Sequence, residues 1–380
     1  MSILHLLNLS VKDEYIREYK KILDPRNLGK VQHSLSTIIF SALCGVLAGC
    51  DNWNEIRDYC KVKKDWLSRH VSFKNGVPSS DTFRRVFSLL DPNNMENLLR
   101  THAAEIVDNN KNDNDQIAVD GKSLRGSKRL NSKCLHSVSA WCHENGLIIG
   151  EEQVDSKSNE ITAIPLLLDS LNIKNNTITI DAAGCQKNIV SQIISKKGNY
   201  VLGLKRNHPK LYDAVKQLVK AKGENDKNRL KDGFDDSHGR CVRRRYFGYD
   251  VSKLPEIEEW SGAKTVVAVE TISSKDNDPK RVTTAEWRYF LSNHHHLDNR
   301  LPGYIRNHWS IENKLHWVLD VHMKEDADQK SERNITRSFA LIKRIVLNIV
   351  RTKDTTPKRS LKRKLKHPAW DDDHLLKMLS

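Results

Sequence analysis

The sequence predicts an α+β protein in which an all-helical N-terminal region precedes a mixed sheet with flanking helices. The first 112 residues place apolar side chains at helical spacings. After the polar run at 108–116, three short apolar strands follow one another, and strands then alternate with helices. Strands in succession followed by alternating strands and helices indicate a mixed sheet on which helices pack.

Residues 1–112 form the predicted helical domain. The most apolar run, Leu35–Ala48, contains three hydroxyl side chains and is too short to span a bilayer, so we expect a buried core helix. Ser79, Ser80 or Asp81 can cap a later helix. The helices are expected at 35–50, 52–70, 80–90 and 95–107.

Residues 113–350 form the predicted second domain, and its elements follow the order β-β-β-α-β-α-β-α. The expected strands are 116–120, 135–142, 147–154, 176–181 and 200–204, and the expected helices are 161–171, interrupted at Pro165, 187–197 and 209–222. A β-rich insertion is expected at about 223–295, and a final amphipathic helix at 335–350. Residues 351–380 are expected to form a basic C-terminal tail.

The charge of the chain points to a polyanionic partner. The net charge is +15 and the isoelectric point is about 9.4, which places nucleic acid first among partners. The plain alternative is a protein that is merely basic. The seven cysteines are odd in number and include no Cys-x-x-Cys pair, which argues against disulfide frameworks and cysteine-rich zinc modules. With no secretory signal at the N-terminus, we expect a cytoplasmic protein without a membrane partner.

Trp, His and acidic residues are most concentrated at 306–326, where Leu, Val and Ile at helical spacings predict a helix. Glu312 lies between His308 and His316 at four-residue spacings, so the three share one helix face. Two predicted strands end in Asp120 and Asp181. Three carboxylates brought to one point repel one another unless cations lie between them, and oxygen ligands favour Mg²⁺ or Mn²⁺. Alternatives are a zinc site on the histidine-flanked helix, and aspartates that only cap turns.

Several segments resemble, in this order, the DDE transposases of bacterial insertion sequences, and most closely the H-repeat-associated group. They are AVDGKSLRGS, LHSVSAW, DSKSNEITAIPLLLDSL, TIDAAGCQ, YVLGLKRNHP, DSHGR, RNHWSIENKLHWVLDVHMKEDA and LIKRIVLNIV. The N-terminal segments DPRNLGKVQHSL, ALCGVLAGCDNWNEI and GVPSSDTFRRVF resemble the helical domain associated with that group. The resemblance covers roughly residues 20–350.

The resemblance implies an RNase H-like sheet with a β-rich insertion before the catalytic Glu. It also implies that Asp120, Asp181 and Glu312 are the catalytic and metal-binding triad, with Mg²⁺ or Mn²⁺ as cofactor. Relatives in the wider superfamily carry Tyr, Arg and Lys at set spacings around the Glu, where this chain has Ile305, His308 and Leu319. We therefore hypothesise that His308 replaces the Arg as a phosphate contact.

The expected activity is that of a DNA transposase, an endonuclease that cuts and joins strands at the element ends and target in double-stranded DNA. By analogy with that family, we expect a homodimer on DNA in the bacterial cytoplasm, at the nucleoid. For residues 1–112 the resemblance implies a role in DNA-end binding or in dimerisation. The alternatives are a catalytically silent DNA-binding protein and a nuclease without strand transfer. Trp309 could stack on a base, whereas core packing is expected for Trp317. Predicted DNA contacts, some of which could instead be exposed basic turns, are Lys122, Arg125, Lys157, Lys205, Asn207, His238, Arg240, Arg306, His308, Trp309 and Asn313.

Overall fold

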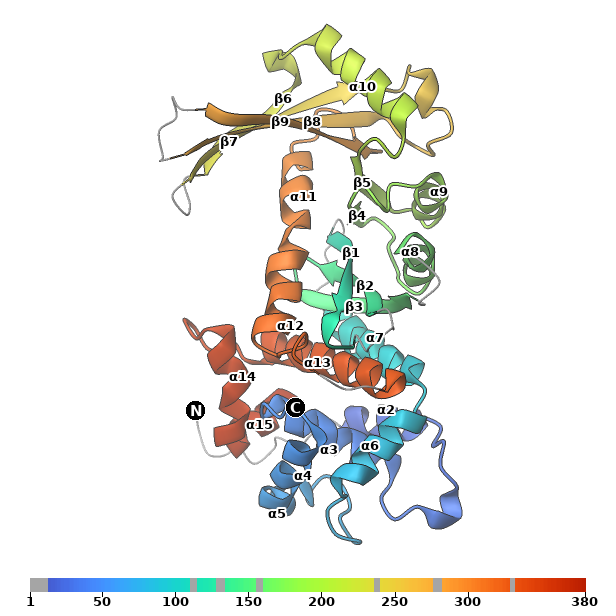
Figure 1. The fold of residues 1–380 in the computed structure, drawn as a ribbon, viewed down its shortest axis with the longest axis vertical. Coiled ribbons are helices and arrows are strands. Elements are labelled where there is room, and N and C mark those ends of the chain that lie inside the picture. Colours follow the sequence, from blue (N-terminus) through green and yellow to red (C-terminus); the bar gives the residue numbers. More distant parts are fainter. Residues whose placement is uncertain are drawn as a thin grey trace.

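One mixed sheet runs through the upper part of the molecule and a helical body lies below it (Figure 1). The computed structural model describes residues 13–109, 115–127, 134–154, 160–235, 240–275, 282–328 and 332–380. Within these residues nine strands pair in the order β3-β2-β1-β4-β5-β9-β8-β7-β6. The predicted fold class, a mixed sheet with flanking helices, is confirmed.

The first half of the sheet has the predicted order of elements. β1 pairs antiparallel with β2 and parallel with β4, and β4 pairs parallel with β5. Helix α8 continues through Pro165, so the predicted interruption there is wrong; Leu167 and Leu168 beyond it remain buried. The bounds are β1 (Gln116–Leu124), β2 (Leu135–Cys142), β3 (Leu147–Val154), α8 (Glu160–Asp169), β4 (Thr177–Ile180), α9 (Lys187–Ser195), β5 (Asn199–Leu204) and α10 (Pro209–Lys222).

The segment expected as an insertion is rich in strands, but these strands extend the same sheet. β9 pairs antiparallel with β5, with Val201 opposite Ser292, and β8, β7 and β6 follow outward. In Figure 1, α10 lies over these strands. The bounds are β6 (Arg229–Asp235), β7 (Arg240–Asp250), β8 (Thr265–Lys275) and β9 (Val282–Ser292). Short 3₁₀ turns are η1 (Leu28–Lys30), η2 (Arg125–Ser127), η3 (Asp226–Asn228) and η5 (Pro255–Ile257).

The N-terminal helices form around one buried helix. Every residue of α3 is buried, as its apolar sequence predicts. Ser34, Asn52 and Ser79 cap three helices by accepting hydrogen bonds from main-chain N–H groups in the first turn. The bounds are α2 (Asp13–Lys21), α3 (Leu35–Leu47), α4 (Trp53–Val62), α5 (Lys64–Leu67), α6 (Ser80–Leu89) and α7 (Pro92–Asn109). Among the described residues, none of the helices is both long and apolar enough to traverse a bilayer.

The expected basic tail is instead folded as helices. α13 (Arg333–Lys353) is followed by α14 (Leu361–Trp370) and α15 (Asp372–Leu379). Leu365, Leu375 and Met378 are buried in the same core as α3 and α13. The prediction of a basic tail is wrong because apolar side chains recur among the Lys and Arg residues of this segment and pack against the helical body. Termini distant in the sequence thus share one core.

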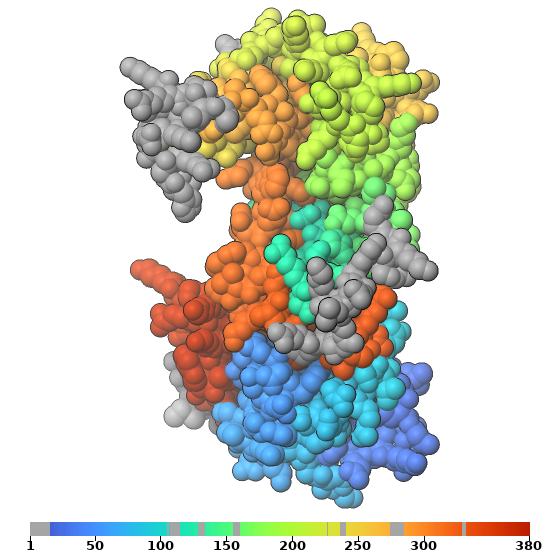
Figure 2. All heavy atoms as spheres, in the orientation of Figure 1, coloured from blue at the N-terminus to red at the C-terminus, as the bar shows by residue number. Residues whose placement is uncertain are grey.

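The predicted helix over 306–326 consists of three shorter pieces. α11 (Leu301–His308) leads into the π-helix η6 (Glu312–His316), which continues as α12 (Trp317–Val321). In Figure 1 these pieces form an upright rod that connects the β-rich end to the helical body. Figure 2 shows the surface indented beside this rod, between the strands above and the C-terminal helices below. A π-turn inserts an extra residue into a helix and is frequent at functional sites.

The rod and the sheet are fastened to α13 by buried ion pairs. The Arg344 side chain is 0% exposed and pairs with Glu151 of β3 and with Glu325, which follows α12. Asn348, one turn further along α13, accepts a hydrogen bond from the N–H of Ile148 at 3.0 Å and donates one to its carbonyl at 2.8 Å. α13 therefore fixes both the edge of the sheet and the end of the segment that carries Glu312.

Removing the guanidinium should destabilise the fold strongly. Arg344→Met leaves Glu151 buried without its cation and removes one of the cations that pair with Glu325, which keeps Lys122 at 3.5 Å; the loss costs on the order of 3–5 kcal/mol of unfolding free energy. Arg363→Met, at an exposed position of α14, is the matched control and should change stability by less than about 0.5 kcal/mol. Urea unfolding of the metal-free protein measures both. A loss below about 1 kcal/mol for Arg344→Met would contradict the structural role of the ion pairs.

Candidate active site

Strand register brings Asp120 and Asp181 to neighbouring positions. Val119 of β1 pairs in parallel with Ile180, the last residue of β4. The next residue on each strand is the aspartate, and β4 ends there while β1 continues. Asp181 Oδ1 accepts hydrogen bonds from the N–H groups of Ala183 at 2.9 Å and Gly184 at 3.2 Å, so a turn holds this carboxylate in place.

The rod supplies the third carboxylate on the same face of the sheet. Ala118 belongs to the same hydrophobic cluster as Ile311 and Leu315 of the rod. Because side chains alternate along a strand, Asp120 shares its face with Ala118 and points toward the rod. α11 also packs against β1, β4 and β5. Asp120, Asp181 and Glu312 all line one cavity of about 410 Å³.

The surroundings of Asp120 disfavour the ionised form of its carboxyl group. Burial raises the pKa of this carboxyl to about 7, and the negative charges of Asp181, Glu160 and Glu312 add to the effect. Three carboxylates along one cavity offer oxygen ligands to a hard divalent cation, whose charge would offset their repulsion. The three residues therefore fit the Mg²⁺ or Mn²⁺ expected from the sequence.

The two histidines that flank Glu312 have separate partners. His308 Nδ1 lies 3.1 Å from Thr179 Oγ1, whereas His316 Nδ1 lies 3.7 Å from Asp120 Oδ2. Burial lowers the pKa of each imidazole to about 4, so both are neutral at pH 7. Because the two imidazoles contact side chains on different strands, their arrangement does not support the zinc alternative. A neutral His308 cannot supply the positive charge of an arginine.

The predicted DNA contacts separate into four groups. Lys205, His308 and Trp309 line the cavity with the acids. The exposed residues outside the lining are Arg125, Arg306, which lies 3.5 Å from Asp235, and Asn313. Lys157 and His238 lie outside the described residues, as does the side chain of Arg240.

Two of the predicted contacts have structural partners. The Lys122 side chain is only 6% exposed, and its ammonium lies 2.6 Å from Asp320 and 3.5 Å from Asp326. In this arrangement Lys122 links β1 to α12 and to the segment that follows it. The Asn207 amide donates to the Ala182 carbonyl at 2.8 Å and supports the turn after Asp181.

The expectation for Trp317 was wrong. Its side chain is 52% exposed and packs edge-on against His322, with the ring centres 4.9 Å apart. The buried side chains of this segment, Ile311, Leu315, Val318 and Leu319, recur at helical spacings along one face, and Trp317 lies on another face.

Sequence reasoning missed Arg288, and it considered Glu160 only as part of a polar run before a helix, with a possible site role. Arg288 of β9 lines the cavity, with its guanidinium 5.9 Å from the ring centre of Trp309. Glu160, at the start of α8, pairs with His136 Nε2 at 2.6 Å. A Cβ on Gly121 would lie 2.1 Å from the Glu160 carboxylate, so a residue with a side chain would displace it. In the sequence, Gly121 directly after Asp120 could have indicated that another side chain packs closely against the main chain at this position.

Asp120 gives the metal-free protein a predicted pH dependence. Its pKa is higher in the folded chain than its ordinary value of 3.8, so stability falls as pH rises from about 4 to about 7. Asp120→Asn removes this titration, and its gain in Tm over wild type should grow across that range and then level off. Asp213→Asn, at an exposed position of α10, is the control. Thermal unfolding in EDTA measures both, and a pH-independent gain would contradict the assignment.

Comparison with known proteins identifies the family. Residues 111–349 match the family described as "Transposase DDE domain", and residues 16–103 match the one described as "DDE_Tnp_1-associated". The chain is 38% identical to "Putative transposase YncI" of Escherichia coli O157:H7, over 94% of this chain and 92% of that protein. It is 35% identical to "H repeat-associated putative transposase YhhI" of Escherichia coli (strain K12), over 94% and 96%.

A solved structure of a piggyBac transposase synaptic complex with hairpin DNA aligns with 96% of this chain and 79% of its own, at 11% identity and a TM-score of 0.38. We draw no conclusion from a likeness at that score. The family matches and the two relatives confirm the resemblance seen in the sequence motifs. The chain belongs to the DDE transposase family, with the associated N-terminal domain ahead of the DDE domain.

Proposed function

We propose that the chain is an active transposase that cuts and joins DNA strands at the ends of an insertion sequence. The observation that carries the proposal is the meeting of Asp120, Asp181 and Glu312 along one cavity. The net charge of +15 supports a double-stranded DNA partner. Relatives named as putative transposases support the same activity. Because an insertion sequence has two ends to be cut, we expect a homodimer on DNA. We expect it to act in the bacterial cytoplasm, at the nucleoid.

The three carboxylates would hold Mg²⁺ or Mn²⁺ through their oxygens. When bound, the ions supply Lewis-acid activation of a water or a 3′ hydroxyl and stabilise the leaving oxygen. Lys205, which is exposed at the cavity, offers positive charge to the scissile phosphate. Trp309, backed by Arg288, offers a ring to an unpaired base. Neutral His308 supports the rod through Thr179 and contributes a hydrogen bond rather than a charge.

Strand cleavage and joining test the proposal. The substrate is a labelled duplex that carries the inverted repeat flanking the gene, with a supercoiled plasmid as target and Mg²⁺ present. Wild type should yield cleaved and joined products. Asp120→Asn, Asp181→Asn and Glu312→Gln should each lower the rate at least about 100-fold, because each removes metal-ion stabilisation worth several kcal/mol.

Glu258→Gln, at an exposed position outside the cavity lining, is the matched control and should retain activity. A gel-shift assay without divalent ions checks that each triad variant still binds the duplex. Retention of full rate by two of the three triad variants would refute the proposed triad. Cleavage without joined products would identify a nuclease, and binding without cleavage a silent DNA-binding protein.

The proposed phosphate contact at Lys205 predicts a change in salt dependence. Lys205→Ala should weaken binding of unrelated duplexes equally and lower the slope of log K against log salt by about 1. Lys210→Ala, exposed on α10 but outside the cavity lining, is the control and should keep the slope. Fluorescence anisotropy at several salt concentrations gives both slopes, and equal slopes for Lys205→Ala and wild type would rule the contact out.

A further inference from the structure

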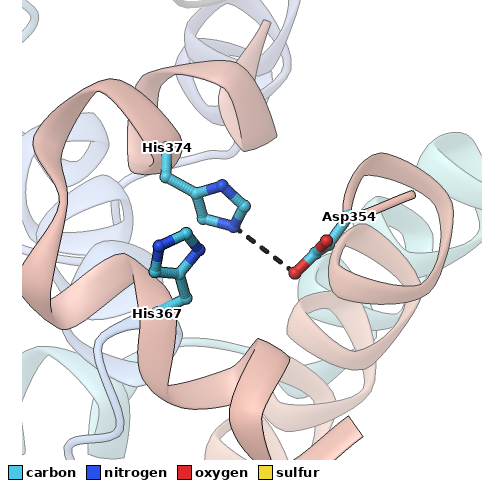
Figure 3. Close-up of side chains that lie close together, drawn as sticks. All are labelled: Asp354, His367 and His374. Atoms are coloured by element: carbon cyan, nitrogen blue, oxygen red, sulfur yellow. Dashed lines mark ion pairs between the residues drawn. The ribbon is translucent and has the colours of Figure 1, made fainter. Parts of the chain in front are cut away.

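A second group of metal-binding side chains gathers where the C-terminal helices fold back against α13. Asp354 ends α13, His367 lies in the last turn of α14, and His374 lies near the start of α15. Figure 3 shows the two imidazole rings beside each other, opposite the Asp354 carboxylate. One candidate ligand atom from each residue lies within 4.8 Å of the other two. None of the three lines the cavity of the triad.

Two of the atoms face each other in a buried place without hydrogen-bond partners. The Asp354 side chain is 0% exposed and that of His374 10%. Asp354 Oδ2 and His374 Nε2 lie 3.5 Å apart, and neither makes a hydrogen bond. Leaving buried polar atoms unsatisfied is costly. Two ligands of a tetrahedral Zn²⁺ ion are separated by about 3.3 Å, given bonds of about 2.0–2.1 Å, so the gap suits an ion.

The surroundings orient both groups for binding. Asp354 Oδ1 accepts a hydrogen bond from the Thr356 N–H at 2.9 Å, which leaves Oδ2 directed toward the rings. His374 Nε2 faces that oxygen at 3.5 Å, and a neutral imidazole can donate its lone pair to a metal.

We propose that Asp354, His367 and His374 form a structural site for a divalent transition-metal ion, best suited to Zn²⁺. Two imidazole nitrogens with one carboxylate oxygen match the ligand preference of Zn²⁺, whereas Mg²⁺ prefers oxygen alone. Three protein ligands leave the fourth position of a tetrahedral ion to water. The site is thus separate in place and in metal preference from the carboxylate triad.

His367 must exchange one partner to bind. The Arg359 guanidinium lies 2.6 Å from His367 Nδ1, and arginine can only donate hydrogen bonds. An imidazole that gives one nitrogen to a metal carries its proton on the other, so this contact is lost whichever nitrogen binds. With the metal on Nδ1, the Nε2–H group faces Asp371, whose Oδ2 lies 3.7 Å away. A carboxylate in that position commonly orients a metal-binding histidine.

A metal ion at this site would link α14 and α15 to the end of α13 and so to the helical body. The ligands come from the end of α13 and from both helices that follow, and Leu365 and Leu375 beside them belong to the core shared with α3. Because the ligands are brought together only in the folded chain, metal-binding free energy adds to the stability of this region.

Co²⁺ is the spectroscopic probe for the site. The full-length, untagged protein carries Asp120→Asn, Asp181→Asn and Glu312→Gln together, so that the triad does not compete for metal. After EDTA treatment and dialysis, it should bind one Co²⁺ per chain with a visible absorption band that Zn²⁺ abolishes. Zn²⁺ should also raise its Tm. Absence of stoichiometric Co²⁺ binding would overturn the proposal.

Substitutions in the same background locate the site. His367→Ala should weaken Co²⁺ binding at least about tenfold, because a direct ligand contributes no less than an outer-shell partner. Its side chain is 24% exposed, so the fold should tolerate the change. Asp354→Asn, which keeps the shape of the buried side chain, should weaken binding likewise.

Two further variants sharpen the result. Arg359→Ala should tighten Co²⁺ binding, because it frees the imidazole and removes a neighbouring positive charge. His295→Ala, an exposed histidine outside the group, is the control and should leave binding unchanged. Circular dichroism checks that each variant is folded. Unchanged Co²⁺ dissociation constants in both His367→Ala and Asp354→Asn would refute the site.

Discussion

The placement of the carboxylates of Asp120, Asp181 and Glu312 along one buried cavity is the constraint on which the rest of the structure depends. The cavity that they line already raises the pKa of Asp120 to about 7, chiefly through burial. A fold that holds such charges together without a cation does so at the expense of stability. The three carboxylates must therefore be held in place by the surrounding structure. The pairing of β1 with β4 positions Asp120 and Asp181, and the rod positions Glu312.

The support for the rod is itself electrostatic. Arg344 binds the acid that follows the rod and the acid on β3, while Lys122, two residues after Asp120, binds acids at the end of the rod. These ion pairs join β1, β3, α13 and the Glu312 segment into one unit. The N-terminal helices complete it, since their core includes side chains of α13, α14 and α15. The site thus depends on segments from almost the whole length of the chain.

The order of strands and helices followed from local patterns, because apolar runs between turn residues depend on neighbours in the sequence. Two aspartates at strand ends and Glu312 in the run at 306–326 indicated a possible carboxylate site from the residues alone, and the family resemblance implied that these three form the triad. Features set by distant contacts were not predictable. The π-helix at Glu312–His316 is one such feature, and another is the packing of the basic C-terminal segment, as helices, against the core that contains α3 and α13. The burial of Lys122 depends on acids about 200 residues away, which no local pattern reveals.

Anomalous diffraction from crystals soaked in Mn²⁺ tests the central claim most directly. The account predicts Mn²⁺ density in the cavity, with carboxylate oxygens of Asp120, Asp181 and Glu312 within bonding distance, and none in crystals of Asp120→Asn/Glu312→Gln. Mn²⁺ density confined to other parts of the molecule at saturating concentration, with the three carboxylates unliganded, would contradict it.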